Sequence, residues 1–428
     1  MLTDEEYSYR DELLFCEDIS LSSIAAEFGT PAYVYSTQAI RRNYKAYERA
    51  LTGIEHRICY AVKANSNLAV LQILARLGAG FDIVSAGELY RVLKAGAKAK
   101  DVVFSGVGKT APELSYALEN GIYSFNCESE AEIELIAEIA SRLSVEASVA
   151  LRVNPDVDAI THPYISTGLS EHKFGVDFNQ VEALYDRVMK LPGLRPEGVS
   201  CHIGSQLLDV APVQEAADKV LDLVGRLRRK GVPIRHVDLG GGLGVRYRPS
   251  DRKPSIEELA RCLKSKLAGK DLVLLLEPGR SIVADAGILL TRVLLTKSNG
   301  TKTFVVVDAA MNDLLRPTLY QAHHEISPVR LSNGAQPIEA DVVGPVCETG
   351  DFLARGRQLP SVDMGDLLAV RTAGAYGFVL SSNYNSRPRA CEVLVDRDKA
   401  HLARERESWP DLVRGEYLIK NAVSVGSE

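Results

Sequence analysis

The chain has 428 residues, of which 46% are apolar and 25% are charged, a composition that is ordinary for a globular protein. Its formal net charge is −6 and it contains no basic block, which makes nucleic acid and anionic membranes poor candidates for partners. The longest purely apolar runs have about five residues, whereas a membrane-spanning helix needs about 20.

The first 36 residues begin as MLTDEEYSYRDELL, which is acidic and polar where a secretory signal would be basic and then apolar. They end in PAYVYS (31–36), a strand-like piece. The seven cysteines of the chain are scattered, odd in number and without a C-x-x-C pair. We therefore expect a protein of the reducing cytoplasm without structural zinc.

From about residue 57 to residue 280, short apolar runs alternate with longer amphipathic segments. The runs, which we interpret as strands, are 57–63, 80–85, 101–106, 123–128, 146–155, 198–204, 235–242 and 271–280. The segments between them, such as NLAVLQILARLG and SEAEIELIAEIASR, repeat apolar residues at helical spacing after Ser, Asp or Thr caps. Eight strand–helix units predict an α/β fold with a closed TIM-type (β/α)8 barrel. An open doubly wound sheet is the alternative, which the lack of G-x-G-x-x-G after the first strand disfavours.

The sequence pattern changes after residue 285, where strand-like runs replace the alternation of strands and helices. KTFVVVDAA, IEADVVGPVCE, GDLLAVRTA and CEVLVDRD have the character of strands and are separated by Gly, Pro and Asn turns. They predict a mostly antiparallel β domain, with which PAYVYS pairs. We thus expect a barrel over residues 37–284, and a β-rich domain made of residues 1–36 and 285–428.

Polar residues fall on or at the ends of the predicted barrel strands, where the site of such a barrel lies. Lys63 ends the first strand, Arg152 the fifth, His202 the sixth and Glu277 the eighth, while Asp82 lies on the second. The seventh ends in Gly240, Gly241 and Gly242. Taken one at a time, most of these residues have ordinary explanations. A lysine at a strand end is usually solvated, and a single histidine is usually a packing residue of the core.

Together, these residues match what pyridoxal phosphate requires. A lysine amine can form a Schiff base, and a carboxylate can keep the pyridine nitrogen protonated so that the ring accepts electrons. Bare backbone amides of a glycine run can hold a phosphate. The sequence therefore predicts pyridoxal phosphate as the cofactor, attached at Lys63.

Eleven motifs in order then make the chain similar to a known family. They are YAVKAN, FDIVSAGE, FSGVGK, THPYISTGLSEHKFG, HIGSQ, LGGGLG, EPGRSIVA, MNDLLRPTLY, VVGPVCETGD, GAYGF and YNSRPR. The chain resembles, over nearly its whole length, the fold type III (alanine racemase-like) decarboxylases that use pyridoxal phosphate.

The resemblance implies a role for each matching residue. Lys63 holds the cofactor, and Cys347 donates a proton to the carbanion that remains after CO2 leaves. The resemblance places the other cofactor contacts at Asp82, Arg152, His202, Ser205, Gly240, Gly241, Gly242, Glu277, Gly279, Arg280 and Tyr376. It places the substrate contacts at Arg280, Arg316, Tyr320, Glu348 and Tyr376. It also implies a homodimer in which Cys347 and Glu348 reach the neighbouring subunit's site. For Cys347, an inert packing thiol is the alternative.

The charges of the substrate set favour one kind of substrate. Two guanidiniums, Arg280 and Arg316, suit a far carboxylate, and Glu348 suits a far ammonium. meso-Diaminopimelate, with an amino acid group at both ends, satisfies this set and would give L-lysine and CO2. The alternatives are a decarboxylase of another basic amino acid, a racemase, or a catalytically inactive homologue that only binds the cofactor. For Arg316, a purely structural position on the surface is also open.

The segment THPYISTGLSEHKFG (161–175) is rich in Gly, Ser and Thr, and the resemblance implies that it closes over the site as a lid. His162 and His172 lie ten residues apart without helical i,i+4 spacing, so we do not expect them to bind a metal. The pair His323 and His324 has the same interpretation. The sequence predicts no metal site.

Overall fold

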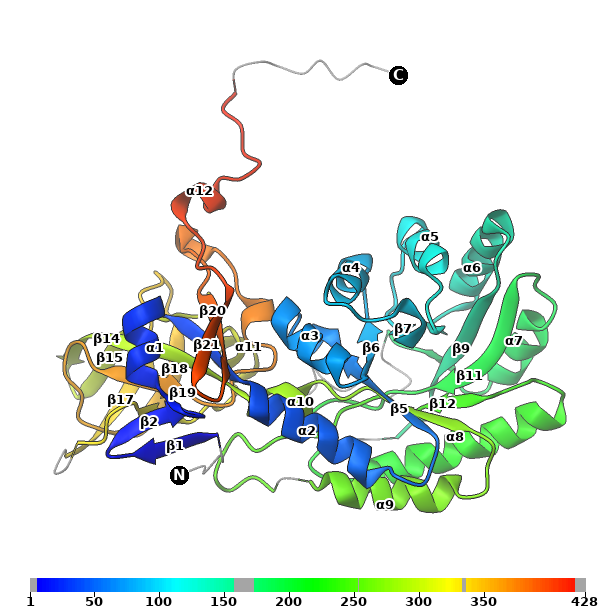
Figure 1. Ribbon diagram of the computed structural model, residues 1–428, viewed down its shortest axis with the longest axis horizontal. Helices are drawn as coiled ribbons and strands as arrows, with labels where there is room; N and C mark the ends of the chain where they lie inside the picture. Colours follow the sequence, from blue (N-terminus) through cyan, green and yellow to red (C-terminus); the bar gives the residue numbers. More distant parts are fainter. Residues whose placement is uncertain (1–5, 158–172, 253, 333–335, 420–428) are drawn as a thin grey trace.

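The computed structural model describes residues 6–157, 173–252, 254–332 and 336–419. Figure 1 shows a barrel surrounded by helices and, beside it, a domain built on a β-sheet. The chain enters the barrel through helix α2 (Thr37–Ala50) and leaves it through the short helix α10 (Arg280–Val283) and the long strand β14 (Gly287–Asn299). Among the residues described, no helix is both long and apolar enough to cross a membrane.

Eight parallel strands form the closed barrel. They pair around the ring in chain order, and the pairing of the last strand with the first completes it. The strands are β5 (His56–Ala61), β6 (Gly80–Ile83), β7 (Val102–Phe104), β8 (Ser124–Cys127), β9 (Ala147–Asn154), β11 (Leu194–Ser200), β12 (His236–Asp238) and β13 (Val273–Leu276). A two-residue strand, β10 (Val176–Asp177), pairs only with β9. The predicted barrel is confirmed, and each of the eight strands overlaps its expected segment, although β11 begins four residues earlier than predicted.

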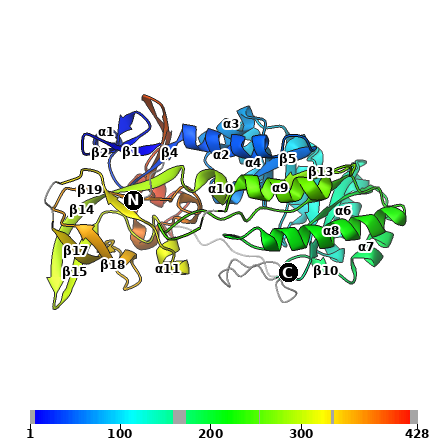
Figure 2. The same ribbon diagram turned by 90° about the horizontal axis from the view of Figure 1, so that it is seen from below.

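Helices form the outer layer of the barrel, and Figure 2 shows α8 and α9 lying along one side of it. After α2, they are α3 (Leu68–Arg76), α4 (Ala86–Lys94), α5 (Ala111–Asn120), α6 (Glu130–Leu143), α7 (Val181–Val188), α8 (Ala211–Arg229) and α9 (Ile256–Leu267). Several begin at a polar cap, as expected. The side chains of Asn67, Ser85 and Ser129 accept hydrogen bonds from the first-turn amides of α3, α4 and α6.

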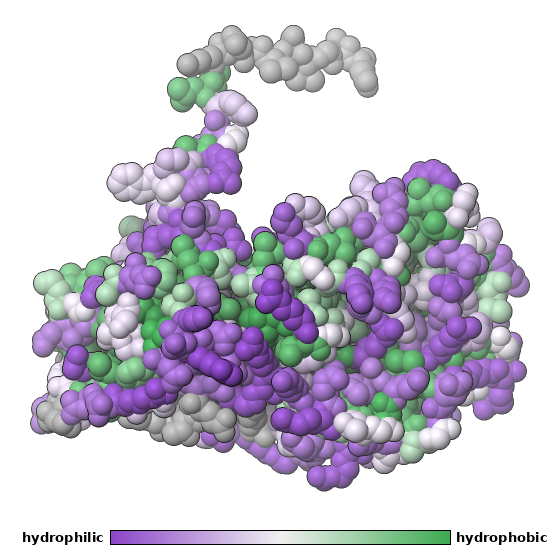
Figure 3. Space-filling model, viewed as in Figure 1, coloured by the Kyte–Doolittle hydropathy of each residue, from purple (hydrophilic) through white to green (hydrophobic). Residues whose placement is uncertain are grey.

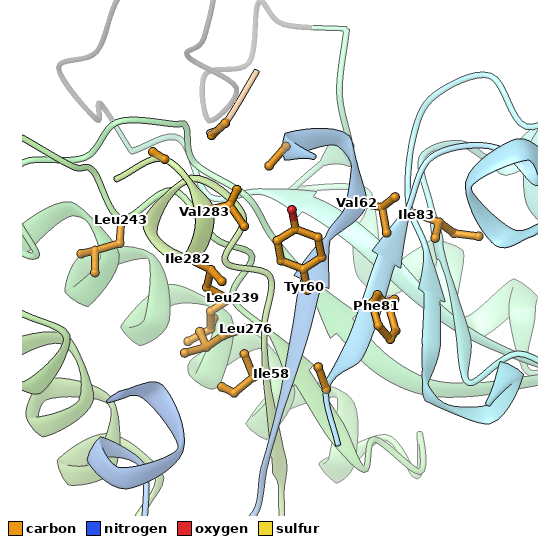
Figure 4. Packing of buried hydrophobic residues seen from close by; sticks show 14 of the residues in the cluster. Ile58, Tyr60, Val62, Phe81, Ile83, Leu239, Leu243, Leu276, Ile282 and Val283 are labelled. Atoms are coloured by element: carbon orange, nitrogen blue, oxygen red, sulfur yellow. The ribbon is translucent and has the colours of Figure 1, made fainter. Parts of the chain in front are cut away.

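The main core lies between the barrel strands and the helices. Figure 4 shows Ile58 and Tyr60 of β5 close to Leu276 of β13, with Ile282 and Val283 of α10 beside them. All five side chains are buried. Because a parallel strand is covered on both faces, its sequence is almost continuously apolar, which is the pattern that revealed these strands. The face seen in Figure 3 is, by contrast, mostly hydrophilic.

The second domain holds a mixed, mostly antiparallel sheet. Besides β14, it contains β4 (Ala32–Ser36), β15 (Lys302–Val307), β16 (Ile326–Pro328), β17 (Pro337–Val343), β18 (Phe352–Pro360), β19 (Leu367–Val370), β20 (Cys391–Asp396) and β21 (Lys399–Arg404). The N-terminal strand β4 lies inside this sheet, antiparallel to β14 and parallel to β20. The predicted pairing of PAYVYS with the β domain is therefore confirmed.

Smaller elements complete the domain. A separate three-stranded sheet is formed by β1 (Tyr7–Arg10), β2 (Leu13–Cys16) and β3 (Ile19–Ser20), followed by α1 (Leu21–Phe28). Two short helices, α11 (Arg316–Tyr320) and α12 (Trp409–Leu412), lie in its later part. Figure 1 shows the segment after β21 projecting away from both domains.

A buried carboxylate ties the two domains together. Glu392 in β20 has no exposed surface and accepts hydrogen bonds from the Tyr35 hydroxyl and the Asn67 side-chain amide, each at 2.8 Å. It also accepts from the Arg404 guanidinium. Asn67 is the N-cap of α3 in the barrel, so this one side chain joins the β-sheet to the barrel next to Lys63.

Replacing Glu392 by alanine is expected to lower the stability of the folded chain by about 2–4 kcal/mol, because three donors lose their shared acceptor. The measurement is the denaturant midpoint of the purified variant. Glu339→Ala, in the exposed part of β17, is the control and should change stability by no more than about 0.5 kcal/mol. Equal effects of the two substitutions would contradict this role of Glu392.

Candidate active site

Lys63 lies just past the end of β5, in one turn of 3-10 helix, η1 (Val62–Ala64). Its Nζ donates a hydrogen bond to Oδ2 of Asp82, which is fully buried in β6, at 2.6 Å. Burial alone would lower the pKa of Lys63, but the carboxylates of Asp82 and Glu277 outweigh it and raise that pKa above its usual range. The lysine is therefore an ammonium ion before any ligand binds.

Two cavities meet at Lys63. The first has a volume of about 360 Å³ and lies at the junction of the barrel with the β domain. Its lining comprises Ala61, Lys63, His202, Ser205, Gln206, Gly242, Tyr247, Arg248, Glu277, Gly279, Arg280, Arg316, Tyr320, Ala322, His323 and Tyr376. The second has a volume of about 420 Å³ and extends over the barrel strands toward Ser105, Asn126, Arg152 and Ser200. Lys63, His202 and Glu277 line both cavities, so the two form one continuous site.

Carboxylates gather below Lys63. Glu277 follows β13 directly and is buried, and its Oε1 accepts from the Ser105 hydroxyl and the Asn126 amide, both at 3.3 Å. Burial and the nearby carboxylates of Asp238 and Asp82 hold the pKa of Glu277 well above its usual range. A positive charge brought next to Glu277 would reverse that shift and make it a full carboxylate.

His202 follows β11 and presents a neutral ring to both cavities. Burial, together with the positive charges of Arg152 and Lys63, lowers the pKa of His202 well below its usual range. Its Nδ1 accepts a hydrogen bond from the Gly241 amide at 3.3 Å. A neutral, flat imidazole of this kind can stack on an aromatic ligand without repelling a cationic ring.

The glycine triplet after β12 is required by close backbone packing. A Cβ on Gly240 would lie 2.6 Å from Nδ1 of His202, and a Cβ on Gly241 would lie 2.1 Å from the Glu277 carbonyl oxygen. A Cβ on Gly242 would lie 2.2 Å from the Gly204 carbonyl oxygen, and Gly240 and Gly242 also have positive φ angles of 66° and 101°. Of the three, only Gly242 is among the lining residues of the first cavity.

Arg280 stands next to this loop at the start of α10. Its guanidinium donates to the Ser205 hydroxyl at 3.0 Å and to the Tyr247 hydroxyl at 2.7 Å. It also lies over the Tyr376 ring, 4.7 Å from the ring centre. Its buried Nε has no hydrogen-bond partner. The Gly242 backbone at the cavity wall, a hydroxyl and a guanidinium with a free donor are suited to a phosphate group.

Arg316 enters the first cavity from α11 of the β domain. It is buried, and its guanidinium carbon lies 5.0 Å from the centre of the Tyr247 ring and 5.7 Å from that of Tyr320. Its Nε donates to Nε2 of His324 at 3.3 Å. The alternative of a surface position for Arg316 is therefore wrong.

His324 serves to hold this arginine. Its Nδ1 donates to the Arg371 carbonyl oxygen at 2.9 Å, which leaves Nε2 as the acceptor for Arg316. Burial and the charge of Arg316 lower the pKa of His324 to about 3, so the ring stays neutral.

In the described part of the chain, no three His, Cys, Asp or Glu side chains are grouped to hold a metal ion. The proposed lid residues 161–172, with His162 and His172, lie outside the described residues.

Cys347 and Glu348 do not lie in this site. Both are exposed, and neither is among the lining residues of the two cavities. Their turn is firmly held, because the Asp351 carboxylate accepts from the amides of Val346 and Met311, each at 2.7 Å. The Cys347 amide donates to the Asn385 side chain at 2.8 Å. A single copy of the chain thus presents this turn outward.

Most of the other predicted residues do come together. Arg152 lines the second cavity. The first cavity is lined by Lys63, His202, Ser205, Gly242, Glu277, Gly279, Arg280, Arg316, Tyr320 and Tyr376. Asp82 lies beneath Lys63 without lining either cavity. Three residues of the site were not predicted from the sequence. Tyr247 lies between the two arginines, and Asn126 and Asp238 lie beside Glu277. Asp238 had a visible signal, since it is an acid in an apolar strand, whereas Tyr247 lies in a loop that no local pattern marks.

These residues fit pyridoxal phosphate. Besides the groups suited to a phosphate, the site contains buried polar atoms without partners, namely Oδ1 of Asp82 and Nε of both Arg152 and Arg280. Such atoms cost free energy unless a ligand satisfies them. A lysine on a barrel strand end, a buried acid and a neutral histidine complete the donor set. Fold and site together define a barrel-type enzyme that uses pyridoxal phosphate.

Comparison with known proteins identifies the family. Residues 37–284 match the family model described as pyridoxal-dependent decarboxylase, pyridoxal binding domain. Diaminopimelate decarboxylase of Pseudomonas aeruginosa is 56% identical over 97% of this chain and 99% of its own length, and that of Aquifex aeolicus is 49% identical over 95% and 96%. The chain belongs to the diaminopimelate decarboxylase family of pyridoxal-dependent decarboxylases.

Solved structures agree with this assignment. Diaminopimelate decarboxylase from Helicobacter pylori, in complex with L-lysine, matches with a TM-score of 0.89 at 43% identity over 92% of this chain and 98% of that chain. The enzyme from M. jannaschii, also in complex with L-lysine, matches with a TM-score of 0.93 at 39% identity, over 98% of this chain and 99% of that chain. A lysine decarboxylase from Selenomonas ruminantium, at 23% identity and a TM-score of 0.81, shares the fold.

Gly241→Ala is expected to weaken binding of pyridoxal phosphate roughly 10-fold or more. The added methyl group must displace the Glu277 backbone or the glycine loop, and overpacking of this kind costs about 1–3 kcal/mol. The measurement is a titration of the apoenzyme with the cofactor. Gly225→Ala in α8 is the matched control, since its Cβ meets only the flexible end of Arg229 at 3.6 Å. Unchanged affinity in Gly241→Ala would show that the loop tolerates a side chain.

Proposed function

We propose that this protein decarboxylates meso-2,6-diaminopimelate to L-lysine and CO2, the last step of lysine biosynthesis. One observation carries the choice of substrate. Three arginines, Arg248, Arg280 and Arg316, line the first cavity beyond Lys63, and among the lining residues Glu277 is the single acid. A substrate with a far carboxylate is favoured there, whereas the far ammonium of lysine or ornithine would meet guanidiniums.

Several residues of the chain would hold the cofactor together. Lys63 would attach it, Glu277 would pair with the ring nitrogen and His202 would stack on the ring. Ser205, the glycines 240–242, Gly279, Arg280 and Tyr376 hold the phosphate, while Asp82 and Arg152 support the lysine and the ring. When bound, pyridoxal phosphate supplies an electron sink for the pair of electrons that remains on the α-carbon after CO2 departs.

Asp82 controls the charge of Lys63. The ion pair keeps the lysine protonated and in place, so the lysine becomes nucleophilic only when a proton leaves Nζ. The nearest acceptor for that proton is Oδ2 of Asp82, 2.6 Å from Nζ, while Oδ1 of the same carboxylate has no hydrogen-bond partner. The Glu277 carboxylate would keep the nitrogen of a bound pyridine ring protonated, because opposite charges attract.

The far end of the substrate binds between the barrel and the β domain. Arg316 is pre-positioned by His324 and by the rings of Tyr247 and Tyr320, so its guanidinium loses little freedom on binding a carboxylate. Arg280 reaches the same cavity from the phosphate side. Glu348, which would bind the far ammonium, has to come from another copy of the chain.

The active unit is a homodimer in this proposal. Cys347, the acid that returns a proton to the α-carbon, and Glu348 are exposed on their own subunit and lie outside its cavities. Residues 37–284 form the cofactor-binding barrel, and residues 1–36 with 285–428 form the domain that provides the dimer and substrate contacts. The seven cysteines are all free thiols, which supports a cytoplasmic location.

Purified protein with pyridoxal phosphate is expected to absorb visible light and to release CO2 and L-lysine from meso-diaminopimelate. The kcat/KM for L-lysine or L-ornithine should be lower than that for meso-diaminopimelate by a factor of at least roughly 100. Lys63→Ala should lose the visible absorption together with activity, whereas Lys94→Ala on the exposed face of α4 should keep both. A protein that binds the cofactor but ignores diaminopimelate would overturn the choice of substrate, and one that cannot bind the cofactor would be an inactive homologue.

A mixture of two inactive variants tests the shared site. Lys63→Ala lacks the attachment point, and Cys347→Ala should keep the absorption of the bound cofactor but turn over slowly. If each site takes Cys347 from the partner, a 1:1 mixture of subunits regains about a quarter of the wild-type activity, because half the dimers then hold one intact site. If no activity returns although the subunits exchange, Cys347 serves the site of its own chain or no site.

A further inference from the structure

Asp238 is a buried acid to which the mechanism above assigns no role. It is the last residue of β12, two positions before the first glycine of the triplet, and is 1% exposed. Its Oδ1 accepts from the Gly240 amide at 2.9 Å, and its Oδ2 accepts from the Asn126 side chain at 3.0 Å. One carboxyl group thus touches the loop that holds the phosphate and the network that surrounds Glu277.

Asn126 bridges the two acids. Its side-chain nitrogen lies 3.0 Å from Asp238 Oδ2, 3.3 Å from Glu277 Oε1 and 3.0 Å from the Ser105 hydroxyl oxygen. An amide nitrogen carries two hydrogens, so it cannot satisfy three acceptors at once. The Ser105 hydroxyl adds one donor, toward Glu277. The two amide hydrogens of Asn126 and the hydroxyl hydrogen of Ser105 are thus all engaged by Asp238, Glu277 and Ser105. A hydrogen bond between the two carboxyls therefore needs a proton on one of them.

The charges lead to the same conclusion. The carboxyls of Asp238 and Glu277 lie within hydrogen-bonding reach of each other, and both are buried. Two buried like charges this close do not both ionise readily, and the nearest ammonium, Lys63, is already paired with Asp82. Burial raises the pKa of both acids. The carboxylates of Asp238 and Asp82 raise the pKa of Glu277 further, whereas the hydrogen bond with Glu277 lowers that of Asp238, which makes Glu277 the donor of the pair and Asp238 the acceptor.

We propose that Asp238 is a positioning residue that, in the enzyme without cofactor, shares one proton with Glu277, and that this proton leaves the pair when the cationic ring binds. The inference rests on the proposed use of pyridoxal phosphate. The proton balance is simple. The pair changes from a charge of −1 to −2, and its proton passes to the ring nitrogen if the ring arrives neutral, or to solvent if the ring arrives protonated.

The substitution Asp238→Asn removes the charge and keeps the shape. The new amide oxygen can still accept from Gly240, and Asn126 can rotate to accept from the new amide group, because its Oδ1 has no partner in the described structure. Without the neighbouring charge, Glu277 gives up its proton before the cofactor arrives. The variant therefore has one proton fewer to transfer or release, whichever form the ring has.

Calorimetric titration of the apoenzyme with pyridoxal phosphate, in two buffers of different ionisation enthalpy, counts these protons. Wild type should release about one proton more, or take up about one fewer, than Asp238→Asn. Asp341→Asn is the matched control, since Asp341 is a buried acid of β17 that also accepts from a glycine amide, that of Gly356, at 2.8 Å. It should keep the wild-type count. Equal counts in wild type and Asp238→Asn, with normal binding in both, would overturn the proposal.

A second measurement needs no variant. The infrared difference spectrum of wild-type protein, before and after cofactor binding, should show the loss of one protonated-carboxyl band. Absence of that loss would contradict the proposal even if Asp238→Asn fails to fold. If the protein does not bind pyridoxal phosphate at all, the proposed function fails instead, so the two failures are distinguishable.

Discussion

The site depends on an ion pair at the mouth of the barrel, between the Lys63 ammonium and the Asp82 carboxylate at 2.6 Å. It is possible because adjacent parallel strands end at the same level, which places the end of β5 beside β6. Backbone hydrogen bonds then fix the turn that carries the lysine. The Ala61 amide donates to the Pro278 carbonyl oxygen at 3.1 Å, and the Tyr376 amide donates to the Ala64 carbonyl oxygen at 2.8 Å. The end of β5, the segment after β13 that contains Glu277, and the β domain therefore all meet at Lys63.

Around this pair, charge is separated across the cavity. Asp82, Asp238 and Glu277 lie on the barrel side, and Arg280 and Arg316 lie toward the β domain. This arrangement suits a ligand that is cationic at its ring and anionic at its phosphate and far carboxylate. It has a cost in the unliganded protein, because like charges are held close in a buried space. The compensation comes from fixed contacts, such as Asn126 between two acids and Tyr247 between two arginines.

The sequence predicted those parts whose signal is local. Buried parallel strands are apolar throughout, so the eight strands were visible, and their polar ends predicted Lys63, His202 and Glu277. β14 was not predicted, because Thr291 and Arg292 interrupt its apolar run and the exposed Leu294 and Leu295 are apolar, so the sequence shows neither a continuous apolar run nor a regular alternation. Tyr247 and His324 act through residues brought from other elements, which no local spacing encodes. The glycine triplet was predicted as a phosphate cradle, but contacts with the Glu277 and Gly204 backbones explain it first.

The turn with Cys347 and Glu348 shows how an outward-facing segment can still be preorganised. Asp351 accepts two backbone amides and Asn385 accepts a third, so the turn keeps its shape without any contact to its own chain's cavity. Holding an exposed turn this firmly costs conformational freedom, which a purely structural loop does not need. Rigid presentation is useful where a turn must dock into a site already shaped by Lys63, Arg280 and Arg316. The Cys347 thiol is exposed in the single chain, so in the proposed homodimer its surroundings would be set by the partner subunit.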